Sequence, residues 1–233
     1  FYDRFIDDLI ARGIEPMICL YHFDMPLALA QEYNGFNDRR VMDAFIRYGK
    51  KMIDCFGDRV KYWLTFNEQN IFHMPEAFRI SGYMKGDQTL RELYELQHHT
   101  MVAHMALTEY LHQTKPGQLM GGMLAHQLVY PATCKPRDIF CAQQYDEFLN
   151  QNLLRVFAGQ GYSPAVMAVV EQEGFGDIYR AEDLALLART RNDYMAFSYY
   201  ASKTLDSDAI PEGTPVNYYL LHGEKNNPYL KAT

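Results

Sequence analysis

The apolar run at 62–66 ends abruptly in two polar residues, Asn67 and Glu68. In a barrel of alternating parallel strands and helices, the chemistry is carried at the C-terminal ends of the strands. A carboxyl group at such a place, flanked by aromatic side chains, is a candidate general acid that protonates a leaving group. The alternative interpretation is a strand followed by an ordinary solvated glutamate, and the position of Glu68 alone does not decide between the two.

Other predicted strands also end in groups that could bind a ligand. These are His22, Phe23 and Asp24 after 14–21, His126, Gln127 and Tyr130 after 119–125, and Tyr200 after 194–199. Aromatic and hydrogen-bonding groups that converge on one rim suit a polyol such as a sugar. Aromatic faces cover the apolar side of a pyranose ring, while His, Asn and Gln satisfy its hydroxyls. Together these strand ends favour a carbohydrate site.

The elements that position these residues alternate along the chain. Periodicity and turn signals predict helices at 1–12, 39–56, 89–114, 137–158, 164–172 and 181–188, and strands at 14–21, 60–66, 119–125 and 194–199. Such alternation implies a parallel sheet. The chain from 201 onward is rich in Gly, Pro and Asn and is predicted to be a loop. No internal linker marks a second domain.

Composition narrows the class of protein. The 233 residues carry a formal net charge of -7, which argues against general nucleic-acid binding. No run of about eighteen apolar residues could cross a membrane, and no signal peptide is visible. The cysteines form no CxxC pair, and we interpret them as reduced thiols of a cytoplasmic protein rather than a disulfide framework.

A metal site is the alternative use of the first strand end. His22 and Asp24 form an H-x-D pair, but a metal needs further ligands on other strand ends. His126 could serve, yet no set completes a known spacing, so we predict no metal.

Three further histidines, His98, His99 and His104, fall on the long helix predicted at 89–114. Their spacing does not give the helical metal face that two histidines four residues apart would form. We therefore interpret them as surface or helix-packing residues.

Three motifs resemble those of glycoside hydrolase family 1 and follow one another in the family's order. The motifs are Leu20-Tyr21-His22-Phe23-Asp24-Met25-Pro26, Trp63-Leu64-Thr65-Phe66-Asn67-Glu68 and Phe197-Ser198-Tyr199-Tyr200. In order and spacing they are similar to the third, fourth and sixth strands of that family's barrel. The resemblance implies an α/β fold, a (β/α)8 TIM barrel of which only the central portion, about strands 3–6, is present. We expect 1–233 to be a single catalytic domain truncated at both ends. The segments 122–127 and 198–200 are most similar to the 6-phospho-β-glucosidase branch.

The resemblance implies a role at each matching position. Glu68 would be the general acid/base, and Asn67 would bind the sugar 2-hydroxyl. His22 would bind another hydroxyl of the same ring, with Phe23 beside it, and Tyr200 would orient the nucleophile. Gln127 is a candidate for the leaving-group side, with ordinary loop packing as the alternative.

The family's nucleophile lies in a Glu-Asn-Gly motif on the seventh strand, which we expect outside this chain. Glu171 and Glu173 are poor substitutes, because they precede the last predicted strand and end the helix that Pro164 begins. The Asn-Tyr-Tyr string at 217–219 repeats a family string outside any strand pattern, so we interpret it as a decoy.

The implied activity is that of a retaining β-glycosidase that hydrolyses 6-phospho-β-D-glucosides to glucose 6-phosphate and an aglycone. Such substrates are phosphorylated during uptake, which implies a bacterial cytoplasm, and no cofactor is needed because both steps use carboxyl groups. A β-glucosidase or 6-phospho-β-galactosidase remains an alternative. A non-catalytic sugar-binding half-barrel is the alternative from another class.

Overall fold

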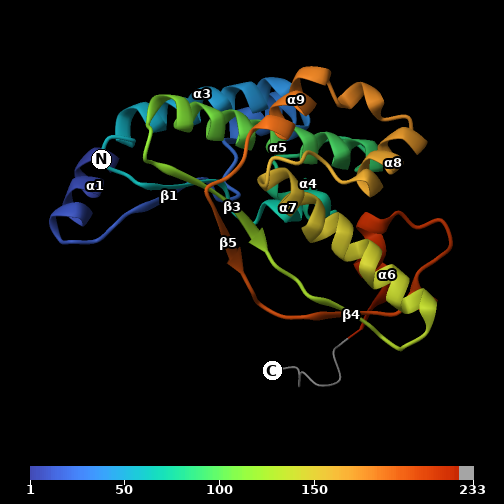
Figure 1. The fold of residues 1–233 in the computed structure, drawn as a ribbon. Helices are drawn as coiled ribbons and strands as arrows, with labels where there is room; N and C mark the ends of the chain where they lie inside the picture. The colour runs from blue at the N-terminus through green and yellow to red at the C-terminus, as the bar shows by residue number, and fades with distance from the viewer. Residues whose placement is uncertain (226–233) are drawn as a thin grey trace.

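The computed structural model describes residues 1–225 as a four-stranded parallel sheet with helices packed on one side. The sheet order is β1 (Met17–Tyr21), β2 (Tyr62–Phe66), β3 (Leu119–Ala125) and β5 (Tyr194–Ser198). Figure 1 shows the long helices α3 (Arg39–Phe56) and α5 (Leu90–Thr114) lying together on one side of the strands. All four strands lie within their predicted ranges, so the predicted parallel sheet is confirmed.

The sheet is open. In the described part of the chain, β1 and β5 each have a neighbouring strand on one side only. A closed (β/α)8 barrel has eight strands. The observed sheet therefore corresponds to part of such a barrel.

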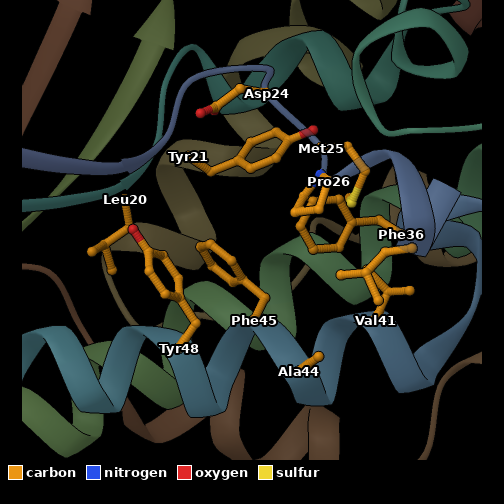
Figure 2. Close-up of a pocket in the computed structure, with 11 residues that line it drawn as sticks. Leu20, Tyr21, Asp24, Met25, Pro26, Phe36, Val41, Ala44, Phe45 and Tyr48 are labelled. Carbon is orange, nitrogen blue, oxygen red and sulfur yellow. The ribbon is translucent and has the colours of Figure 1, made fainter.

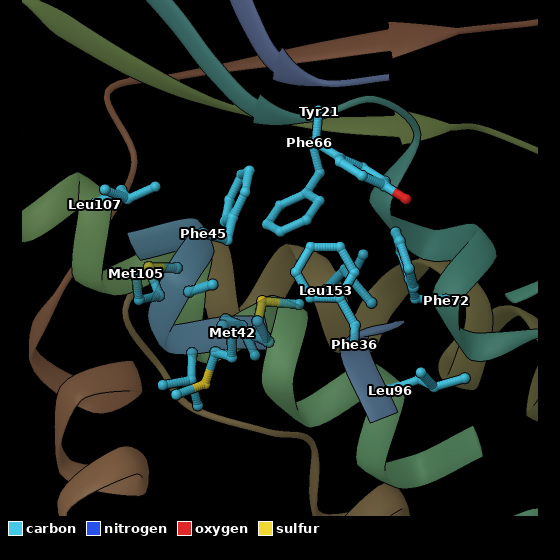
Figure 3. Packing of buried hydrophobic residues seen from close by; sticks show 14 of the residues in the cluster. Tyr21, Phe36, Met42, Phe45, Phe66, Phe72, Leu96, Met105, Leu107 and Leu153 are labelled. Carbon is cyan, nitrogen blue, oxygen red and sulfur yellow. The ribbon is translucent and has the colours of Figure 1, made fainter. Parts of the chain in front are cut away.

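An aromatic cluster fills the space between the sheet and the helices (Figure 3). Phe66 of β2 stands 4.7 Å from Phe45 of α3, 5.5 Å from Phe36 and 5.8 Å from Phe72, measured between ring centroids. All four rings are buried. Because Phe66 immediately precedes Asn67 and Glu68, this packing fixes the end of the strand that carries them.

The pair Gly121-Gly122 allows close packing on both faces of β3. A Cβ at Gly121 would lie 2.3 Å from the ring of Tyr194, and one at Gly122 would lie 2.5 Å from the ring of Phe157. The space at Gly121 lets the Tyr194 hydroxyl reach across and donate to the Trp63 carbonyl at 2.8 Å. Both glycines are therefore required by contacts, and not by backbone conformation.

The remaining long helices follow the sequence closely, and they are α1 (Tyr2–Ala11), α8 (Pro164–Gln172) and α9 (Ala181–Arg189). The stretch predicted as one helix at 137–158 consists of α6 (Pro136–Asp146), a π-helical turn (Glu147–Gln151) and α7 (Asn152–Phe157). The prediction of a helix there is confirmed, but the wider π turn was not foreseen.

Short elements were missed. Helices α2 (Leu27–Tyr33) and α4 (Ala77–Ile80) lie in segments for which the sequence predicted neither a helix nor a strand. The prediction of a loop from 201 onward is wrong, because β6 (Lys203–Leu205) pairs in parallel with β4 (Val129–Pro131) and antiparallel with β7 (Glu224–Lys225), and α10 (Tyr219–Gly223) lies between β6 and β7 in the sequence. Strands of two or three residues are too short for an alternating pattern to reveal.

No helix within residues 1–225 is both long enough and apolar enough to cross a bilayer. All four cysteines are free thiols in the structure.

Candidate active site

Glu68 lies two residues beyond the end of β2 in an unusual backbone conformation. Its φ and ψ are 45° and 55°, the left-handed region that residues other than glycine adopt rarely. Its side chain is nearly buried, with 6% of the residue exposed. A left-handed conformation costs an L-residue about 1–2 kcal/mol and persists where the surrounding contacts enforce it. Glu68 is thus held in place by its neighbours.

Asn67 connects this turn to β1. Its backbone N–H donates to the carbonyl of Tyr21, the last residue of β1, at 2.9 Å. Asn67 is buried, and its side-chain amide makes no hydrogen bond to another described residue. The amide is therefore available to a ligand next to Glu68.

Tyr200 reaches Glu68 from the far edge of the sheet. Its hydroxyl donates to Oε1 of Glu68 in a short hydrogen bond, while most of the tyrosine ring is exposed. The sequence predicted that Tyr200 would contact a nucleophile. In the described residues its carboxylate partner is Glu68, so the structure brings two of the predicted catalytic residues together.

His22 and Phe23 follow β1 directly. Phe23 has a φ of 72°, a second left-handed residue at a strand end, and its ring centroid lies 5.5 Å from that of His22. The backbone N–H of His22 donates to Oδ1 of Asp24 at 3.1 Å. His22 is exposed, so its imidazole is open to a ligand.

The metal alternative gains no support from the geometry. In the described part of the chain, no group of three or more His, Cys, Asp or Glu side chains is arranged to hold a metal ion. The Asp24 carboxylate instead accepts a bond from the neighbouring backbone.

Gln127 lies beyond the end of β3. Its backbone carbonyl accepts from Nδ2 of Asn150 at 3.0 Å, and its side-chain Oε1 is buried without a hydrogen-bond partner among the described residues. Next to it, the His126 ring lies 6.4 Å from both Phe197 and Tyr199, between ring centroids. Phe197 is 67% and Tyr199 55% exposed, which leaves an aromatic surface on the β3–β5 side of the site.

The three helix histidines are buried, so the alternative that they lie on the surface is wrong and helix packing is confirmed. His98 contacts Oδ2 of Asp183 at 3.3 Å and the Tyr162 hydroxyl at 3.0 Å. His99 donates from Nδ1 to the Phe36 carbonyl at 2.8 Å.

His104 on α5 lies between β2 and the residues just before β5. Its Nδ1 stands 2.6 Å from Oγ1 of Thr65 on β2, and its Nε2 stands 3.0 Å from Oδ1 of Asn192. Burial lowers the pKa of His104 to about 4. The imidazole is therefore a neutral structural link and not an acid or base of the site.

The apolar cavity in Figure 2 is not lined by Glu68, Asn67 or Tyr200. It has a volume of about 290 Å³ and lies between β1 and α3, where Leu20, Phe45 and Tyr48 line it. Of the strand-end residues that the sequence singled out, only Asp24 lines it. This cavity is therefore not the candidate active site, which is centred on Glu68 and Tyr200 at the strand ends.

Glu171 and Glu173 do not join the site as a nucleophile would. Glu171 lies in α8, Glu173 follows it as the C-cap, and both side chains are exposed. Tyr218 and Tyr219 fall in helical turns rather than a strand, as expected for a decoy.

Comparisons with known proteins found a matching family and similar proteins. The family model described as "Glycosyl hydrolase family 1" matches residues 1–231. The chain is 34% identical to aryl-phospho-beta-D-glucosidase BglA of Bacillus subtilis (strain 168), over 100% of this chain and 50% of that protein. It is 33% identical to 6-phospho-beta-glucosidase AscB of Escherichia coli (strain K12), over 100% of this chain and 48% of that protein.

A solved structure shows the shared fold. The GH1 beta-glucosidase from Exiguobacterium antarcticum B7 superposes with a TM-score of 0.81 at 22% identity, over 99% of this chain and 50% of that chain. The predicted fold class, part of a (β/α)8 barrel, is thereby confirmed. The chain spans about half the length of the curated relatives it matches.

Proposed function

The chain belongs to glycosyl hydrolase family 1, and on this basis we propose that it carries the acid/base half of the active site of a retaining β-glycosidase. The observation that carries the proposal is the geometry of Glu68. This carboxyl group is nearly buried at the C-terminal end of a parallel strand, in a strained backbone conformation, and it accepts a hydrogen bond from Tyr200. Strain of this kind clusters at functional sites.

In the proposed reaction Glu68 acts twice. It first protonates the glycosidic oxygen as the bond to the sugar breaks, and it then removes a proton from the water that hydrolyses the glycosyl-enzyme intermediate. A second carboxylate, about 5–5.5 Å from the first in retaining enzymes, forms that intermediate. We assign this nucleophile to a part of the protein outside residues 1–225.

The neighbouring side chains bind the sugar. The free amide of Asn67 hydrogen-bonds the 2-hydroxyl, a contact that strengthens in the transition state. The exposed imidazole of His22 binds a second hydroxyl, with the Phe23 ring beside it. Tyr200 holds the Glu68 carboxyl in one orientation through its hydroxyl.

The aglycone lies on the β3–β5 side of this arrangement. Phe197 and Tyr199 expose aromatic faces there, and such faces stack on sugar or aryl rings. Gln127, whose Oε1 has no hydrogen-bond partner among the described residues, is the candidate for the leaving-group side.

The proposed substrate is a 6-phospho-β-D-glucoside, cleaved to glucose 6-phosphate and an aglycone. Its support is the printed function of the relatives, an aryl-phospho-beta-D-glucosidase and a 6-phospho-beta-glucosidase. A substrate phosphorylated during uptake would place the reaction in the cytoplasm. A non-phosphorylated β-glucoside is the competing substrate.

The test compares two substrates and one variant in the whole protein that contains this chain. We expect hydrolysis of an aryl 6-phospho-β-glucoside, much weaker hydrolysis of the matching aryl β-glucoside, and loss of the activity in E68Q. Preference for the non-phosphorylated substrate would overturn the substrate assignment. Sugar binding without hydrolysis of either would favour the non-catalytic alternative.

A further inference from the structure

The hydrogen-bonded ladder between β2 and β3 stops before the strands end. Its last registered pair is Leu64 with Gly121, whereas β3 stays paired with β5 up to Ala125. The N–H of His126 points toward β5, where it donates to the Ser198 carbonyl at 2.8 Å. Because successive residues of a strand direct their backbone groups to opposite neighbours, the N–H and C=O of Ala125 point toward β2, beyond the end of the ladder.

The side chain of Asn70 takes the place of the missing strand. Its Nδ2 donates to the Ala125 carbonyl and its Oδ1 accepts from the Ala125 N–H, each at 2.8 Å. Asn70 is fully buried and Ala125 is 2% exposed. A buried backbone group without a partner is costly, so this pair of bonds fixes the distance between the loop after β2 and the end of β3.

Glu68 lies between this contact and a second one. On the other side, the N–H of Asn67 donates to the Tyr21 carbonyl of β1 at 2.9 Å. The turn that carries Glu68 is therefore attached to both neighbouring strands within the four residues from Asn67 to Asn70. The left-handed backbone of Glu68 is the part of the turn that would relax if one attachment were lost.

We propose that Asn70 is a positioning residue, which aims the Glu68 carboxyl at the glycosidic oxygen by holding its turn against β3. This inference rests on the proposed acid/base role of Glu68. Asn70 does not touch the substrate itself. Its loss displaces the proton donor, so it slows the cleavage of bonds that need protonation more than the cleavage of bonds that do not.

The matched control is Asn34, whose side chain makes the same kind of two-way contact elsewhere. It donates to the Lys85 carbonyl at 2.7 Å and accepts from the Met84 N–H at 2.7 Å. Asn34 follows α2 in the sequence and joins none of the strand ends of the site. Replacing it removes a similar number of hydrogen bonds without touching the turn of Glu68.

The experiment measures kcat and KM of the whole protein for two substrates, a methyl 6-phospho-β-glucoside and a dinitrophenyl 6-phospho-β-glucoside, whose leaving group departs without protonation. We expect N70A to lower kcat/KM, which reports only the formation of the glycosyl-enzyme intermediate, about tenfold to a hundredfold on the methyl substrate and less than about threefold on the dinitrophenyl substrate. N34A should leave both rates unchanged.

A readout independent of turnover separates this inference from the proposed function. The carboxyl ¹³C resonance of Glu68, assigned by its absence in E68Q, should shift in N70A and stay in N34A. If the wild type hydrolyses neither substrate, the proposed function fails, and this resonance still decides whether Asn70 positions Glu68. An unmoved resonance, an equal loss on both substrates, or an equal effect of N34A would overturn the inference.

Discussion

Acidification should destabilise the fold through His104, because this residue is buried as a neutral imidazole. It is fully buried and links Thr65 on β2 to Asn192 before β5. Burial lowers its pKa from an ordinary 6.5 to about 4. Between these values the unfolded chain binds a proton that the folded chain does not, so stability is complete above pH 6.5 and falls as the pH drops toward 4.

The size of this effect follows from the two pKa values. Below both pKa values the loss of unfolding free energy through His104 is complete and amounts to about 3 kcal/mol, and at about pH 5 it has reached about 2 kcal/mol. His99, with a pKa lowered to about 4, and His73, with a pKa lowered to about 3, add losses of the same sign. The total loss in the wild type therefore exceeds the share of His104.

The assay is urea unfolding of wild type, H104Q and T65V at about pH 7 and pH 5. H104Q is less stable than wild type at both, since it disturbs two contacts, but its loss between the two pH values should be smaller by about 2 kcal/mol. T65V removes the hydroxyl at 2.6 Å and keeps the imidazole, so its loss should be at least as large as in wild type. A loss in H104Q equal to that of wild type would refute the reasoning.

Three further outcomes are expected. Y200F removes the hydroxyl that bonds Glu68, and kcat/KM of the whole protein for aryl 6-phospho-β-glucoside should fall about tenfold to a hundredfold, as for the loss of a hydrogen bond to a charged group; an unchanged value would contradict this role. G122A places a Cβ 2.5 Å from the Phe157 ring and should cost about 1–3 kcal/mol of unfolding free energy; undiminished stability in urea would show that the ring has room to move. The isolated 233-residue chain should release no aryl group from the substrate, because the described site holds one of the two carboxylates; turnover abolished by E68Q would contradict this.

The main elements were predictable because they are long or fully buried. Helix α3 begins and ends at the predicted residues, Arg39 and Phe56. Its start is fixed by Asp38, which caps the first turn by accepting from the Arg40 N–H at 2.8 Å, and Gly57 follows its end as the C-cap. The strands of the parallel sheet are apolar runs bounded by turn residues, which is the pattern of strands covered by helices. Local sequence therefore determined them.

The small sheet was not predictable in the same way. Its pairs, such as Val129 with Lys203, join residues far apart in the sequence, and strands of three residues carry no periodic signal. Their stability comes from packing that a local pattern does not contain. Cys141, Tyr145 and Leu205 are buried in a second apolar cluster beneath this sheet.

For the site, residue types were easier to predict than contacts. The polar pair Asn67-Glu68 was visible as the end of an apolar run, whereas the bond from Tyr200 depends on how the ends of β2 and β5 approach each other. Asn70 was visible as one of several polar residues after the strand, but its role depends on the early end of the β2–β3 ladder. The sequence signal that could have found it is an asparagine in the turn directly after a strand. When such an asparagine is buried, its amide pairs with backbone N–H and C=O groups that would otherwise lack partners.

The acid/base role of Glu68 is tested most directly by azide rescue of E68A in the whole protein. Without Glu68, a dinitrophenyl substrate still forms the glycosyl-enzyme intermediate, but water is no longer deprotonated and the intermediate accumulates. Azide needs no base, so it should restore turnover and yield a β-configured glycosyl azide, while the surface variant E173Q behaves like wild type. Absence of rescue, or an α-configured product, would contradict the assignment of Glu68 as the acid/base of a retaining enzyme.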